Sequence, residues 1–216
     1  MKKEERTLTK AEEKRLQIFN RISNELEQEG YTKTDLTTSV AKANIVGIIY
    51  GLILAVPFAV IFFLVNRDFA MDFGDHFYVK WTILLVAALF LTVVHELIHG
   101  LTWGLFAKER FKSIEFGVIW KMLTPYCTCK EPLKKNQYIV GSLMPCLILG
   151  ILPCIISWFN QNIWVLLMGV IMLMGAGGDL LISKMILSSK NRQSGLYLDH
   201  PTEVGLVVFT KEGDGI

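Results

Sequence analysis

Four apolar runs constrain this chain more than any other feature, because each is long enough to cross a lipid bilayer. They occupy residues 45–65, 81–106, 138–159 and 163–187, and a membrane-spanning helix needs about 20 apolar residues. Apolar residues make up 52% of the chain, and the runs leave little sequence for a separate soluble core. We therefore expect an all-α membrane protein with four transmembrane helices.

Lysine and arginine are distributed unequally among the segments outside these runs. Residues 1–44 carry nine and residues 107–137 carry seven, whereas residues 66–80 carry two and residues 160–162 carry none. Because cytoplasmic loops are rich in Lys and Arg, we expect both termini and the middle loop in the cytoplasm, and a cell-membrane location. The orientation of the chain in the membrane is enough to explain where its basic residues lie. We therefore expect the lipid bilayer as a partner and no binding of nucleic acid.

The runs divide the chain into three predicted regions: a cytoplasmic N-terminal segment (1–43), a four-helix core (44–187) and a cytoplasmic tail (188–216). An amphipathic helix is expected over residues 8–30, lying on the membrane surface, packing on the cytoplasmic loop or remaining solvated. Thr9 and Glu12 fit a capping box at its start, and Gly30 can end it. Its apolar residues recur at helical spacing: Leu16, Phe19, Ile22 and Leu26.

The cytoplasmic loop contains a segment with partly alternating apolar residues. Residues 111–120 are rich in Phe, Ile and Val, and Pro125 and Pro132 follow. This pattern predicts a short β-hairpin near the site, whose edge could pair with an extended substrate peptide. An ordinary structured loop is the alternative.

Residues 95–99 read HELIH, an HExxH pattern inside the second apolar run. On a helix His95 and His99 share one face, so both imidazoles can reach one Zn²⁺, with Glu96 beside the open position of the metal. A polar side chain at the centre of a span costs about 2.5–3.5 kcal/mol, and zinc binding can supply about 10 kcal/mol or more. The alternative is a histidine pair hydrogen-bonded between helices beside a neutral Glu96.

A zinc site that keeps one position for water needs a third protein ligand. Asp179 is the favoured candidate, because about 1.5 Å per helical residue places it at a depth similar to that of His95. Gly175, Gly177 and Gly178 precede it and permit a local break or close approach to the HExxH helix. Two alternatives remain: Asp179 bonds a neighbouring helix or Lys184, or His200 folds back as the ligand.

Cys127 and Cys129 lie in the expected cytoplasmic loop and Cys146 and Cys154 in the third run. Thiols in the cytoplasm stay reduced, so we expect free cysteines, with a Cys127 and Cys129 metal pair as the weaker alternative. The sequence has no dinucleotide fingerprint, phosphate loop or serine elbow. Nucleotide chemistry is therefore not supported.

The chain resembles the site-2 class of intramembrane metalloproteases, and more closely a family of small bacterial membrane zincin peptidases. The resemblance rests on HELIHG at 95–100, GGD at 177–179 and DHPTEVG at 199–205, and it covers most of residues 44–208. It implies that His95, His99 and Asp179 hold zinc and that Glu96 is the catalytic base. The GGD sequence departs from the Asp-Gly pair of the site-2 class, and a PDZ-like insertion is missing.

These features predict a zinc metalloprotease that hydrolyses peptide bonds of membrane proteins or peptides near the cytoplasmic side. Glu96 would take a proton from the attacking water and pass it to the leaving amine. A metal-binding scaffold without turnover and a cation transporter are the alternatives. Retention of Glu96 argues against the scaffold, because metal binding alone needs only the ligands, and four spans without repeats give the transporter little support.

Overall fold

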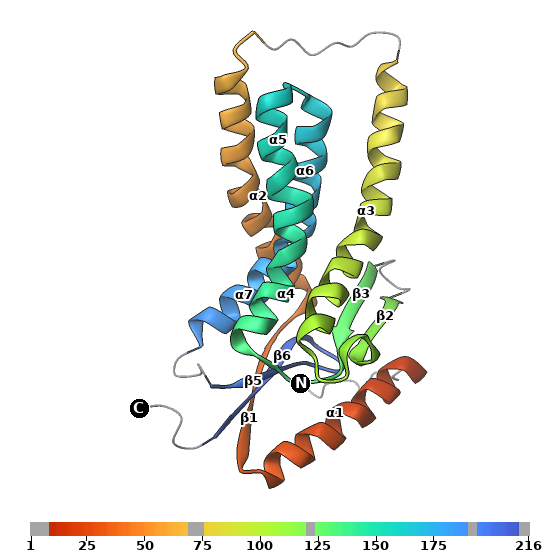
Figure 1. Ribbon diagram of the computed structural model, residues 1–216, viewed down its shortest axis with the longest axis vertical. Helices are drawn as coiled ribbons and strands as arrows, with labels where there is room; N and C mark the ends of the chain where they lie inside the picture. Colours follow the sequence, from red (N-terminus) through yellow and green to blue (C-terminus); the bar gives the residue numbers. More distant parts are fainter. Residues whose placement is uncertain (1–8, 69–75, 120–123, 190–193, 212–216) are drawn as a thin grey trace.

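The computed structural model describes residues 9–68, 76–119, 124–189 and 194–211 (Figure 1). The helices are α1 (Lys10–Gln28), α2 (Val40–Val65), α3 (Phe77–Phe106), α4 (Lys135–Pro145), α5 (Leu152–Asn160), α6 (Ile163–Gly175) and α7 (Gly177–Ser188), with a 3-10 turn η1 (Arg110–Ser113) and a π-helical stretch η2 (Cys146–Ile151). The strands are β1 (Tyr31–Thr38), β2 (Ile114–Ile119), β3 (Thr124–Cys129), β4 (Leu133–Lys134), β5 (Leu196–Asp199) and β6 (Val204–Lys211).

Three helical segments are long and apolar enough to cross a membrane. They are α2, α3 and the continuous helix Lys135–Asn160 that α4, η2 and α5 form together. The helices α6 and α7 pass the same test as a pair, but they are bent by 47° at their junction. The four expected spans therefore correspond to three whole helices and one broken one, with the break next to Asp179.

Of the three glycines before Asp179, Gly177 lies against α2. A Cβ atom on Gly177 would lie 2.0 Å from the Gly47 carbonyl oxygen of α2, whereas Gly175 and Gly178 have open space around them. Of the two expectations for these glycines, the local break is confirmed, and the close approach to the HExxH helix is wrong, because the close backbone contact is with α2. Only a residue without a side chain fits at this crossing.

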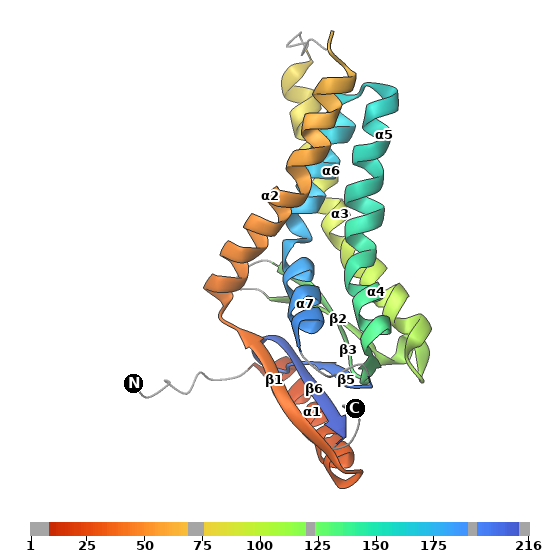
Figure 2. The same ribbon diagram turned by 90° about the vertical axis from the view of Figure 1, so that its left-hand side faces the viewer.

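A four-stranded antiparallel sheet lies at one end of the helices, and it was not expected. Its strand order is β1-β6-β5-β4, and β1 leads directly into α2 (Figure 2). The expectation of an all-α fold is therefore wrong for this end of the molecule. Strand β1 is largely polar, and no pattern in β1 or β6 indicates that the two strands pair. They are also far apart in the chain, since the paired residues Thr32 and Thr210 are separated by 178 positions.

Strand β6 is buried on both faces, which explains its continuous apolar run. Leu206 and Val208 pack toward the helical core with Trp103 and Tyr138. Val207 and Phe209 face the other way and pack with Leu198 of β5 and Leu26 of α1. The sheet thus forms the layer between the spanning helices and α1.

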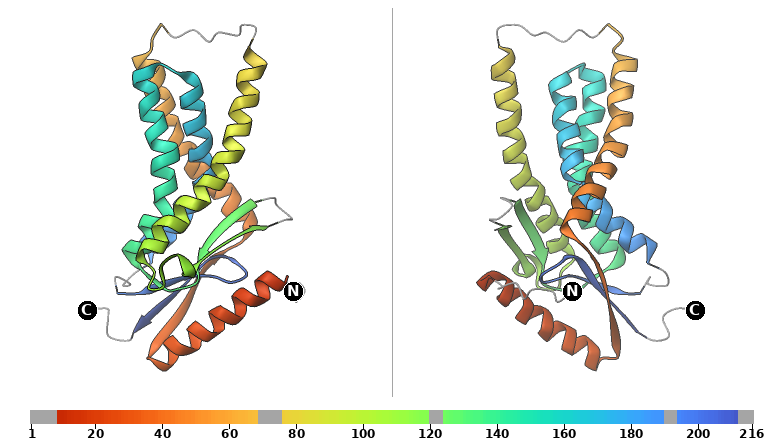
Figure 3. Two further views of the ribbon diagram at one scale, coloured as in Figure 1. Left: turned by 45° about the vertical axis from the view of Figure 1, so that its right-hand side comes forward. Right: turned by 180° about the vertical axis from the view of Figure 1, so that it is seen from behind.

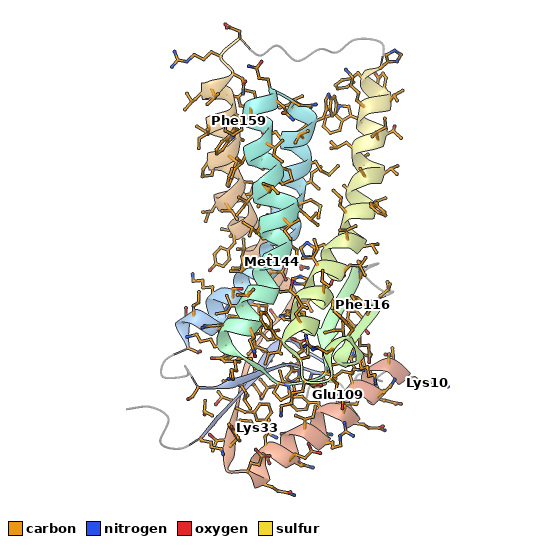
Figure 4. All side chains as sticks on the ribbon, viewed as in Figure 1. Lys10, Lys33, Glu109, Phe116, Met144 and Phe159 are labelled. Atoms are coloured by element: carbon orange, nitrogen blue, oxygen red, sulfur yellow. The ribbon has the colours of Figure 1, made fainter. Side chains whose placement is uncertain are left out.

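Helix α1 confirms the predicted amphipathic segment. Its capping box joins Thr9 and Glu12, Gly30 follows its end at φ +86°, and its apolar face covers the sheet. Charged side chains such as Lys10, Lys33 and Glu109 gather at this same end of the molecule (Figure 4).

The predicted hairpin is confirmed as the pair β2 and β3, which lies beside the lower part of α3 (Figure 3). The Phe116 ring of β2 occupies the space over Gly100 of α3, where a Cβ atom would meet it at 2.4 Å. The predicted end of this segment at Trp120 lies outside the described residues, as do residues 1–8 and 212–216 of the two predicted terminal regions. The hairpin therefore lies directly against the helix that carries the HExxH pattern.

Candidate metal centre

His95 and His99 lie one turn apart on the inner face of α3, as their spacing predicts. Both side chains are buried, their rings are 4.8 Å apart in an edge-to-face arrangement, and their Nε2 atoms are 3.1 Å apart. Asp179 approaches both from the first turn of α7. Its Oδ2 lies 3.0 Å from His95 Nε2 and its Oδ1 lies 3.3 Å from His99 Nε2.

These three residues form a group whose ligand atoms all lie within 4.8 Å of one another. Zn–N bonds of about 2.0–2.1 Å separate two ligands of a tetrahedral site by about 3.3 Å, which is close to the separations of 3.0, 3.1 and 3.3 Å found here. Two imidazoles and one carboxylate are also a usual donor set for zinc. The arrangement therefore fits a zinc ion with one position left for water.

A hydrogen bond fixes the orientation of the His99 ring. Its Nδ1–H donates to the Gly141 carbonyl oxygen of α4 at 2.8 Å, so the neutral ring presents an unprotonated Nε2 to His95 and Asp179. Metal-binding histidines commonly use a second bond of this kind to fix tautomer and direction. The ring also stacks on the Trp103 indole, with centroids 5.0 Å apart and an interplanar angle of 13°.

Sequence reasoning missed Trp103 and Gly141. Trp103 follows His99 by four residues and therefore continues the helix face of His95 and His99, a signal that could have identified it. Gly141 provides the space for the indole, since a Cβ atom there would lie 2.0 Å from Trp103 Nε1. The indole N–H donates to the Tyr138 carbonyl oxygen at 3.1 Å. Only the packing of α3 on α4 makes the role of Gly141 visible.

Glu96 follows His95 on α3 and lies outside the group of three ligands. It is half-buried, and the Cys127 backbone N–H of β3 lies close to its carboxylate. Its charge is close enough to interact with those of His95, His99 and Asp179. The hairpin thus borders the side chain that the HExxH pattern assigns to proton transfer.

His200 has a different environment from the three ligands. Its Nδ1 accepts backbone N–H groups of Thr202 at 3.3 Å and Glu203 at 2.9 Å, and its ring lies 6.2 Å from that of Phe19 on α1. It supports the turn between β5 and β6. Among the described residues, the group of convergent ligand atoms contains Asp179 and not His200.

The four cysteines are free thiols in the structure, as expected. Burial raises the pKa of Cys129 to about 12 and raises that of Cys127 as well, and the neighbouring carboxylates of Asp199 and Glu96 act in the same direction on Cys127. Zinc binds the thiolate form. Neutral thiols at positions 127 and 129 therefore make a poor metal site.

Residues 88–193, a little under half of the chain, match the family model described as "Putative zincin peptidase". The match includes His95, Glu96, His99 and Asp179. No curated protein matches the chain, and no solved structure does. Over this segment the sequence is therefore similar to the zincin peptidase family model, and the ligand group found within it suits the zinc that such a family implies.

Proposed function

We propose that the protein is an intramembrane zinc-dependent endopeptidase, with a site like that of site-2 proteases, that cleaves membrane-associated proteins near the cytoplasmic side. One observation carries the proposal: His95 and His99 of α3 meet Asp179 of α7, within 4.8 Å, inside a set of long apolar helices. Glu96 stands beside His95 on the same helix. This is the side-chain set that metal-assisted peptide hydrolysis requires.

The outer faces of the helices support placement in a membrane. In the most apolar stretch of α3 only 6% of the residues are buried, and in that of α2 only 17% are buried. Leu89 and Phe90 of α3 are 74% and 66% exposed. An apolar surface of this extent is unsuited to water and suited to acyl chains. His95 and His99 of α3 instead face inward, toward α4 and α7, as intramembrane ionisable groups do.

The chain's own residues divide the work of hydrolysis. His95, His99 and Asp179 would hold the zinc ion, which would supply Lewis-acid chemistry at the peptide carbonyl and at the attacking water. Glu96 accepts a proton from the attacking water and delivers it to the nitrogen of the leaving amine. The Cys127 N–H, which lies close to the Glu96 carboxylate, favours the orientation needed for both transfers. His99 keeps its direction through its bond to Gly141 and its stacking on Trp103.

The substrate is a membrane protein or a peptide segment that can become extended at the site. Helical hydrogen bonds shield the scissile carbonyl, so a substrate helix has to unwind locally before its peptide bond can be attacked. The break beside Asp179 is tolerated within a span because Ala176 and Gly177 are buried in protein. The hairpin beside Glu96 adds partly exposed non-helical backbone next to the site.

The decisive experiment measures zinc content and cleavage of co-expressed membrane proteins for detergent-purified wild type and Glu96→Gln. We expect about one zinc per chain in both proteins, and loss of cleavage only in Glu96→Gln, because the variant keeps the ligands and loses the base. Glu13→Gln makes the same change at an exposed position of α1 and should behave as wild type.

Other outcomes separate the alternatives. Zinc binding without cleavage by any of the three proteins would indicate a metal-binding scaffold. Metal-ion flux in reconstituted vesicles that survives Glu96→Gln would indicate a transporter. Cleavage that survives Glu96→Gln would contradict the proposed base.

A further inference from the structure

Asp199 is half-buried and joins three parts of the chain near the metal centre. It ends β5, and its carboxylate accepts hydrogen bonds from Thr128 Oγ1 at 2.5 Å, from the Cys129 backbone N–H at 3.3 Å and from the Tyr138 hydroxyl. Thr128 and Cys129 belong to β3, and Tyr138 belongs to α4. Burial raises the pKa of Asp199, and the three donors oppose this by stabilising the charged form.

The contacts to β3 reach Glu96 through the edge of the strand. Cys127 and Cys129 are two residues apart, so their backbone N–H groups point to the same side of β3. The Cys129 N–H donates to Asp199, and the Cys127 N–H lies close to the Glu96 carboxylate. Asp199 therefore holds the strand one repeat away from the N–H group beside the Glu96 carboxylate.

The contact to Tyr138 reaches His99 through a stack of aromatic rings. The Tyr138 ring lies 5.3 Å from the Trp103 ring, and the Trp103 ring lies 5.0 Å from that of His99. The Tyr138 carbonyl oxygen also accepts the Trp103 indole N–H. Both ends of Tyr138 are thus tied down, its hydroxyl by Asp199 and its backbone by Trp103.

We infer that Asp199 is a positioning residue for the metal centre, which fixes Glu96 through β3 and His99 through Tyr138 and Trp103. The expected effect of Asp199 on turnover rests on the proposed function. The expected effect of Asp199 on metal geometry does not depend on turnover. Asp199 touches neither the ligands nor Glu96 in the described structure and lies beyond residues 88–193, the segment matched by the family model.

The test compares wild type, Asp199→Asn, Tyr138→Phe and Thr128→Val in detergent, with Co²⁺ as the metal probe. Asn at position 199 keeps the shape of the side chain but cannot accept all three donors. We expect an altered visible spectrum of the Co²⁺ protein and a zinc affinity lower by about tenfold, within the range for outer contacts of metal ligands. Tyr138→Phe should reproduce this effect, because it interrupts only the path to His99.

With a peptide substrate, Asp199→Asn should lower kcat by about 10–100-fold and leave KM nearly unchanged. Thr128→Val should lower kcat with little change in the Co²⁺ spectrum, because it interrupts only the path to Glu96. Asp35→Asn, at an exposed position of β1 in the same sheet, is the matched control. Each variant should unfold in a single thermal transition near that of wild type. If Asp199 had only a structural role, the changes in the Co²⁺ spectrum and in kcat would instead be accompanied by a lower unfolding temperature.

A wild-type Co²⁺ spectrum and zinc affinity in both Asp199→Asn and Tyr138→Phe would overturn the inference, whatever the turnover. If wild type binds Co²⁺ but cleaves nothing, the proposed function fails, and an altered spectrum in Asp199→Asn still supports the positioning role. If Asp199→Asn does not fold, Tyr138→Phe and Thr128→Val decide the question, since each removes one hydrogen bond and keeps the Asp199 carboxylate.

Discussion

At the residue scale, contacts outside the ligand group set the direction of His99. His99 bonds Gly141 and stacks on Trp103, and the Cys127 N–H lies close to Glu96. Asp179 gains its direction from its place in the first turn of α7, directly after the bend. Changing such an outer contact typically lowers metal affinity by about 10–100-fold, and loss of a ligand itself should lower it further.

We predict that His95→Ala, His99→Ala and Asp179→Ala each lose most of the bound zinc, while His200→Ala retains it. The three convergent residues supply the whole protein part of a four-coordinate site, whereas His200 accepts bonds in a turn. Metal analysis of purified protein measures the difference. Anomalous scattering at the zinc edge checks it independently, and a metal about 2.0–2.1 Å from a His200 nitrogen would contradict the assignment.

At the element scale, the broken span α6 and α7 is the feature that brings Asp179 to α3. The break allows α7 to leave the direction of α6 by 47°, and Gly177 lets α2 pass against it with backbone in contact. The Ser142 hydroxyl of α4 donates to the Asp179 carbonyl oxygen at 3.3 Å and adds a hydrogen bond at this point. The geometry of the ligand set therefore depends on a helix crossing that contains no ligand.

We predict that Gly177→Ala destabilises the protein and weakens zinc binding, while Gly178→Ala does neither. A Cβ atom at Gly177 would lie 2.0 Å from the Gly47 carbonyl oxygen, and at Gly178 it meets nothing within 4 Å. Overpacking of this kind costs about 1–3 kcal/mol, whereas Gly to Ala in an open helical position gains about 0.5–1 kcal/mol. Thermal unfolding in detergent with and without zinc tests the pair, and equal behaviour of the two variants would disprove the role of the crossing.

At the scale of the whole molecule, the apolar and charged parts are separated along the long axis. The sheet, α1 and the hairpin gather at one end, and the helix connection between α5 and α6 lies at the other (Figure 1). An aromatic cluster of Trp81 and Trp164, with rings 5.4 Å apart, joins α3 and α6 near that far end, as suits a membrane interface. The metal centre lies toward the sheet, the end that the proposed orientation places on the cytoplasmic side.

We predict that reporter fusions at Lys121 and after Ile216 lie in the cytoplasm and that fusions at Asp72 and Gln161 lie outside. The basis is the excess of Lys and Arg in residues 1–44 and 107–137 over residues 66–80 and 160–162. Paired phosphatase and fluorescent reporters measure the two sides in one set of strains. A Lys121 fusion on the outside would reverse the orientation and place the metal centre in the opposite leaflet.

The sequence alone was sufficient for the local features of this protein. Spacing of three residues between His95 and His99 defines a helix face, and the lengths of the apolar runs predict the spanning helices, because both follow from regular helix geometry. The helical rise per residue also predicted that Asp179 and His95 lie at similar depths in the membrane. In the structure His95 Nε2 and Asp179 Oδ2 are 3.0 Å apart. The capping box at Thr9 and the hairpin next to the site are local signals of the same kind.

The tertiary structure decided everything that depends on pairing between distant segments. Strands β1 and β6 pair across most of the chain, and the contacts of Asp199 with Thr128 and Tyr138 bridge 71 and 61 positions. The approach of Gly177 to α2 rather than α3 belongs to the same class. Periodicity records which face of an element is apolar, but not which surface covers it. That choice is made by packing the whole chain at once.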